Sequence, residues 1–207
     1  MSRFGTLIYK DKLTFKHKIG LLLISLSTLM LEFTLIRVLS VSLWYHFAFM
    51  IISIALLGFG ISGVTLAVSD KIHKSGTSNL LTIISFIFAL AILISFYLTN
   101  KIPFDPFSLL VDNKQFLYLP AYYLLITLPF FLSGLIIGIL FSRFKMEINK
   151  LYFFDLAGAG LSCFVFIWVL PMYGGSGGVI AASIIAVLAT ISFATNITKF
   201  RTTVIIA

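Results

Sequence analysis

The chain has 207 residues, of which 60% are hydrophobic and only 11% are charged, against about 25% charged in an average soluble domain. This composition excludes an ordinary soluble domain and predicts an integral membrane protein. A single cysteine excludes an intrachain disulfide and a cysteine-based metal cluster, and the net charge of +8 has to be judged from where the charges lie.

The first apolar run follows a polar, basic segment, residues 1–18, that carries five Lys and Arg residues. No A-x-A-like cleavage site closes the run, so we expect an uncleaved first span from 19 to about 43. The sequence Trp-Tyr-His at 44–46 suits the membrane interface. The second span is expected at about 47–69, and a polar loop at 70–78 follows it.

The third span is expected at 79–97, and the longest connection follows it at 100–114. The fourth span covers about 116–142 and contains Pro129. Proline removes a helix hydrogen bond and clashes with the preceding turn, so it should kink this helix.

The fifth and sixth spans are expected at about 151–171 and 178–196. The glycine-rich sequence MYGGSGG between these apolar runs predicts a tight turn. It is not expected to be a phosphate-binding loop, because it lacks the Lys-Ser/Thr ending of that motif. The transmembrane domain is therefore 19–196, and the predicted fold is an all-α, polytopic helical bundle of about six spans. We interpret residues 197–207 as a C-terminal tail that is either short or truncated just before a further span or a soluble domain.

The positive charges indicate a topology. Twelve of the fifteen Lys and Arg residues fall into four segments that six spans would place on one side: 1–18, 70–78, 143–150 and 199–201. The opposite side holds only Lys101 and Lys114. Because cytoplasmic loops are rich in Lys and Arg, the sequence predicts a cytoplasmic N-terminus and a multi-pass protein of the cell membrane. The lipid bilayer, and not a nucleic acid, is the expected partner.

Three glycines, Gly58, Gly60 and Gly63, spell the G-x-G-x-x-G pattern of dinucleotide-binding loops. That motif needs a preceding strand and an acidic residue about 20 residues later, whereas these glycines lie inside an uncharged membrane span. Small residues spaced by four let a neighbouring helix approach closely. Gly58 and Ser62 have this spacing, and Gly60 and Gly63 widen the patch, so we expect helix packing and no cofactor.

Three charged residues lie inside apolar spans: Glu32, Arg37 and Asp155. Such charges are costly in a bilayer and are functional hypotheses by default. One interpretation is a structural ion pair between Glu32 and Arg37, although i and i+5 positions lie about 140° apart around a helix. The other is a path for a proton, an ion or a polar solute. No metal site and no catalytic residue is expected, because neither a Ser-His-Asp nor a paired-carboxylate arrangement is visible.

Three stretches carry a resemblance to a known family, and one of them, AFMIISIALLGFGISG, looks like the small-residue second span of that family. The sequence LEFTLIRVLSVSLW, with the Glu-x4-Arg spacing of Glu32 and Arg37, resembles the first-span signature of fused, spermidine synthase-like (polyamine aminopropyltransferase-like) integral membrane proteins. The sequence LYFFDLAGAGLSCFVFIWVLPMYGG is similar to a later segment of that membrane domain. The positions on its pattern are Tyr152, Asp155, Leu156, Gly158, Ala159, Pro171 and Gly174. Gly158 is a further candidate for helix packing.

In that family a soluble Rossmann-type domain, similar to aminopropyltransferases and methyltransferases, follows the membrane domain. The resemblance therefore implies a membrane module that is non-catalytic alone and that anchors or feeds a soluble synthase-like or methyltransferase-like partner. The alternative is a small transporter or channel for a polar or cationic solute, with Glu32 and Asp155 facing a cavity. The sequence offers no basis for an oligomeric state.

Overall fold

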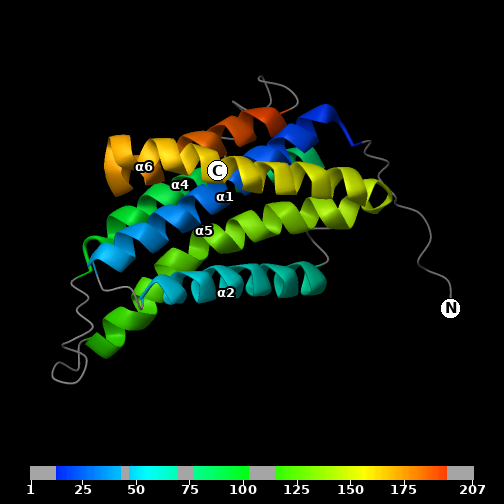
Figure 1. The fold of residues 1–207 in the computed structure, drawn as a ribbon. Coiled ribbons are helices and arrows are strands. Elements are labelled where there is room, and N and C mark those ends of the chain that lie inside the picture. The colour runs from blue at the N-terminus through cyan, green and yellow to red at the C-terminus, as the bar shows by residue number, and fades with distance from the viewer. Residues whose placement is uncertain (1–12, 43–46, 70–76, 103–114, 195–207) are drawn as a thin grey trace.

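The computed structural model describes residues 13–42, 47–69, 77–102 and 115–194, and these residues form a bundle of helices (Figure 1). The helices are α1 (Phe15–Ser42), α2 (Phe47–Val68), α4 (Thr77–Thr99), α5 (Gln115–Arg143) and α6 (Ile148–Phe193), with a short 3₁₀ helix, η2 (Lys145–Glu147), between α5 and α6. The described ranges contain no β-strand. An all-α helical bundle is therefore confirmed.

Five of these helices are long and apolar enough to cross a membrane, with spans of 20 to 49 residues. About 20 apolar residues are needed to cross the hydrocarbon core. By length and composition the chain is a multi-pass membrane protein. Six crossings and a cytoplasmic N-terminus stay predictions.

Gly174 divides α6 into two limbs. Its φ of 66° and ψ of −168° are not helical, and glycine takes a positive φ without the steric cost that a Cβ would bring. A straight helix of 46 residues would be about 69 Å long at 1.5 Å per residue, more than twice the hydrocarbon thickness. The bend falls inside the segment where the sequence predicts a turn between two spans.

The two limbs run in opposite directions along α1. On the first limb, partner numbers on α1 rise with those on α6, and on the second limb they fall. The pairs are Phe15 with Phe154 and Phe33 with Phe166 for the first limb, and Thr34 with Gly178 and Ser27 with Ala182 for the second. The colours of Figure 1 show the same course, since the yellow limb leads to an orange bend and the red limb returns.

Because α6 reverses, the helix termini gather at two ends of the bundle, which we call the near end and the far end. The near end holds the start of α1, and a Cβ built on Gly20 would overlap the ring of Phe193 at the end of α6. The start of α4 lies there as well, because the Ser78 hydroxyl donates to the Phe193 carbonyl oxygen at 2.7 Å. Arg143, at the end of α5, donates to the Thr77 hydroxyl at 2.6 Å. The far end holds the end of α1, the end of α4 and the bend of α6.

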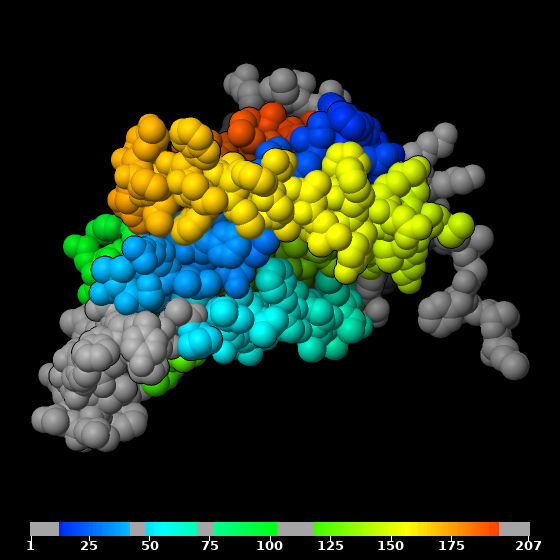
Figure 2. Space-filling model, in the orientation of Figure 1, coloured from blue at the N-terminus to red at the C-terminus, as the bar shows by residue number. Residues whose placement is uncertain are grey.

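The core lies where α1 meets α6, α5 and α2, and where α4 packs on α5 and α6. Its fully buried side chains include Met30, Phe88, Phe130, Ile136 and Phe193. α2 lies at the edge of the bundle against α5 (Figures 1 and 2). Its outward face is apolar and exposed, for example at Phe49, Leu56 and Val64, which suits lipid because alkyl tails are as apolar as these side chains.

Some predicted boundaries shift. The first helix begins at Phe15 and so includes part of the basic segment, and α4 begins at Thr77 within the predicted polar loop. The basic loop after the fourth span is largely helical, because η2 joins α5 to α6 almost directly. The aromatic cluster at 44–46, most of the connection at 100–114 and the tail from 195 lie outside the described residues.

Cysteine labelling would test the number of crossings and their direction. Single cysteines replace Asn100, Tyr173 and Met146 in a Cys163→Ser background, since these side chains are exposed. With two crossings in α6, we expect Asn100→Cys and Tyr173→Cys at the far end to react from one side of the membrane. Met146→Cys at the near end should react from the cytoplasmic side. Tyr173→Cys reacting from the same side as Met146→Cys would contradict six spans.

Candidate functional site at the α1–α6 interface

The first limb of α6 meets α1 at a close backbone contact. A Cβ built on Gly158 would overlap the carbonyl oxygen of Leu22, with the Leu22 Cα only 3.0 Å away. One turn from these residues on each helix, the Ser25 hydroxyl donates a hydrogen bond to the Asp155 carboxylate. The absence of a side chain at Gly158 lets the helices approach closely, and the hydrogen bond belongs to the same contact region.

Ser25 begins a polar strip on one face of α1. The strip consists of Ser25, Thr28 and Glu32, spaced i, i+3 and i+7, positions that share one face of an α-helix. The Thr28 hydroxyl donates to the Ile24 carbonyl oxygen at 2.8 Å. Glu32 is half-buried and lies about 10 Å along the axis from Ser25. The strip and Asp155 therefore place two carboxylates on the α1–α6 side of the bundle.

Glu32 and Arg37 do not form the expected ion pair. In the described ranges the structure has one ion pair, between Lys150 and Glu147 at 2.9 Å, and neither Glu32 nor Arg37 hydrogen-bonds through its side chain there. The physical reason is the i,i+5 spacing, which turns Arg37 away from the face that carries Glu32. The structural-pair interpretation is thus corrected. The order along α1 is as expected, with Asp155 beside Ser25, then Glu32, then Arg37.

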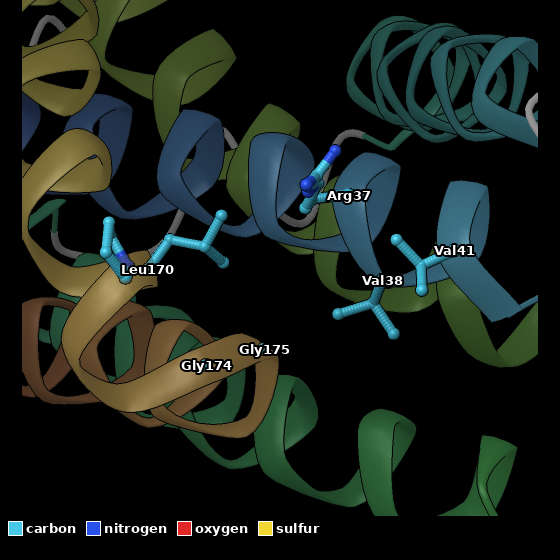
Figure 3. A pocket seen from close by; sticks show the side chains of 7 residues that line it. Arg37, Val38, Val41, Leu170, Gly174 and Gly175 are labelled. Atoms are coloured by element: carbon cyan, nitrogen blue, oxygen red, sulfur yellow. The ribbon is translucent and has the colours of Figure 1, made fainter.

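Arg37 lines a groove at the far end instead (Figure 3). The groove has a volume of about 520 Å³ and lies between α1 and the bend of α6. Its lining is Arg37, Val38, Val41, Leu170, Pro171, Gly174 and Gly175. A Cβ built on Gly175 would overlap a Val38 methyl group, so this glycine lets the bend lie against α1.

A second cavity lies beside Pro129 and is far smaller, with room of about 10 Å³. Its lining includes the Ser95 hydroxyl, which has no hydrogen-bond partner. Neither this cavity nor the groove includes Glu32 or Asp155 in its lining. Nor do the described residues include a group of three or more His, Cys, Asp or Glu side chains that could hold a metal ion.

The small residues of α2 divide into two faces. Gly58 and Ser62 lie against α5: a Cβ on Gly58 would come within 2.8 Å of the Phe131 backbone nitrogen, and Ser62 lies over Gly134. Gly60 and Gly63 face the other way, and a Cβ on either would meet nothing within 4 Å. The predicted patch is therefore corrected, since only Gly58 and Ser62 make contacts within the described chain.

The partner surface on α5 is a feature that the sequence analysis missed. Gly134 and Gly138 form a G-x-x-x-G pattern, the spacing typical of close helix contacts in membranes. Gly134 lies under Ser62, and Gly138 lies under Leu66. Residue numbers on the two helices differ by 72 at both contacts, so α2 and α5 run parallel with matched four-residue steps.

Paired alanine substitutions would test the two faces of α2. Gly58→Ala should destabilise the bundle by about 1–3 kcal/mol, because the new Cβ meets α5 backbone that cannot move aside easily. Gly60→Ala is the matched control and should not destabilise, since its Cβ enters open space and alanine favours the helix. The measurement is thermal unfolding in detergent; equal losses in both variants would contradict this helix rotation.

Double-mutant cycles would separate the two pairs of polar side chains. We expect Glu32→Gln and Arg37→Gln to be additive within about 0.5 kcal/mol, as for residues that share no contact. Ser25→Ala and Asp155→Asn should instead be coupled by about 0.5–2 kcal/mol, the range for hydrogen bonds between membrane helices. Strong coupling between Glu32 and Arg37 in unfolding measurements would support the structural-pair interpretation after all.

Comparison with protein-family models, with curated proteins and with solved structures gives no match to this chain. The resemblance to spermidine synthase-like membrane proteins therefore stays a prediction that rests on the residues quoted for it.

Proposed function

We propose that the chain is a membrane module, non-catalytic on its own, that anchors a soluble Rossmann-type partner and passes a cationic solute to it. One observation carries the proposal. Two of the three segments with the family resemblance are more than 100 residues apart in the sequence, yet they pack against each other as α1 and the first limb of α6. Glu32 and Arg37 thus belong to the same interface as Asp155, Gly158 and Gly174.

The charges of this interface support a cationic solute. Asp155 has a hydroxyl partner, Ser25, and Glu32 has no hydrogen-bond or ion-pair partner in the described ranges. Carboxylates in an apolar bundle are costly unless paired or hydrated. A bound ammonium group would offset that cost, and the family resemblance suggests an amine of the polyamine class.

A small transporter for a cationic solute is the second candidate. The observation that favours it is the spread of three charged residues, Asp155 on α6 and then Glu32 and Arg37 on α1, from the Ser25 level of the interface towards the far end. Neither the groove at Arg37 nor the cavity beside Pro129 includes either carboxylate in its described lining, and this favours the module. The two functions differ in one measurable respect, which is net movement of solute across the membrane.

Spermidine is a suitable probe for both candidates. We expect the purified chain to bind it in calorimetric titrations, with about tenfold weaker binding, roughly 1.4 kcal/mol, in Glu32→Gln and in Asp155→Asn. Glu147→Gln is the matched control, because this carboxylate pairs with Lys150 at the near end.

Proteoliposomes distinguish the two functions. Binding without uptake supports the module, whereas uptake that Glu32→Gln abolishes supports the transporter. If spermidine neither binds nor moves, or if Glu147→Gln weakens binding as much as the two interface variants, the cation-handling role is overturned.

A further inference from the structure

We propose that the groove between Arg37 and the bend of α6 binds an anionic membrane phospholipid, with the Arg37 guanidinium holding the headgroup phosphate. This site is separate from the two carboxylates and does not depend on the proposed cationic solute.

The chemistry of the lining selects an amphiphile. Among the described residues that line the groove Arg37 is the charged one, and the other side chains are apolar: Val38, Val41, Leu170 and Pro171. A volume of about 520 Å³ lies within the usual 300–1,000 Å³ of small-molecule sites. It accommodates a lipid headgroup and the beginning of its acyl chains.

The charge of the groove is uncompensated within the described chain. The Arg37 side chain makes no hydrogen bond or ion pair there, and the α1 carboxylate that could offset it, Glu32, faces elsewhere. A guanidinium presents paired donors that match phosphate oxygens. An unpaired arginine is costly in apolar surroundings, so a phosphodiester bound in the groove removes that cost.

The depth of Arg37 fits a headgroup phosphate. α1 has 28 residues and is about 42 Å long, about 12 Å longer than the hydrocarbon core. Arg37 lies five residues before the end of α1 at Ser42, or about 7–8 Å from that end. It is therefore close to the boundary between hydrocarbon and headgroups, where lipid phosphates are found. The exposed Tyr173 lies beside the groove at the same end and suits the same boundary.

Native mass spectrometry of the purified chain with phosphatidylglycerol and phosphatidylcholine tests the site. We expect phosphatidylglycerol to bind at least fivefold more tightly than phosphatidylcholine, and Arg37→Gln to weaken its binding about tenfold. Lys101→Gln is the matched control, because Lys101 follows α4 at the far end but does not line the groove; it should change binding less than twofold. Equal losses in both variants would overturn the site.

A second variant tests the groove without removing its charge. Val41→Phe should fill the groove and weaken phosphatidylglycerol binding about fivefold, and the exposure of Val41, 72%, makes the fold tolerant of the change. Thermal unfolding confirms that each variant is folded. Unchanged lipid binding in Val41→Phe would overturn the proposal. Inorganic phosphate at millimolar concentration should not compete with phosphatidylglycerol for the groove. Competition would overturn the lipid proposal and identify a free anion as the ligand of the groove.

Discussion

The close approach of α1 to both limbs of α6 is the contact on which the rest of the bundle depends. On one side a Cβ at Gly158 would overlap the Leu22 backbone, and on the other a Cβ at Gly178 would lie 2.6 Å from the Thr34 hydroxyl oxygen. Helices in a membrane gain little from hydrophobic burial against one another, because lipid tails are as apolar as leucine. Van der Waals contact at such glycines and interhelical hydrogen bonds must therefore supply the association energy.

The hydroxyl groups show how this contact extends to the neighbouring helix. The Ser27 hydroxyl on α1 donates to the Ala182 carbonyl oxygen at 2.7 Å, and the adjacent Ser183 donates to the Ala89 carbonyl oxygen on α4 at 3.0 Å. The second limb of α6 is thus bonded on both sides, and α1 and α4 are aligned through it. The Thr28 and Thr34 hydroxyls instead bond within α1, to the carbonyl oxygens of Ile24 and Met30, and contribute no such alignment.

Helix positions were predictable because uncharged runs of about 20 residues have one stable form in a membrane. The second span, expected at 47–69, is α2 at Phe47–Val68. The glycine-rich segment at 172–178 indicated where α6 reverses its direction. Helix rotation was not predictable. A helix that is apolar all round has no polar face to orient it, so Gly60 and Gly63 were assigned to the wrong side.

Prediction of the candidate site from the sequence was limited in the same way. The cost of a charge in hydrocarbon drew attention to Glu32, Arg37 and Asp155, but cost alone does not identify a partner. Asp155 pairs with a serine 130 residues away, and no local pattern specifies that contact. The spacing of Ser25 and Glu32, two turns apart, was the one indication in the sequence that they share a face. The groove at Arg37 depends on where α6 bends, which a glycine-rich segment locates only to within a few residues.

The reversal of α6 also has a consequence for biosynthesis. α1 is the first of the described helices to leave the ribosome, but its main partner is complete only at Phe193, about 150 residues later. At roughly 5–20 residues per second, α1 spends about 8–30 seconds in the membrane before the second limb exists. During that interval the Ser27 hydroxyl has no Ala182 carbonyl to bind, and the first helix made is the last to reach its final environment.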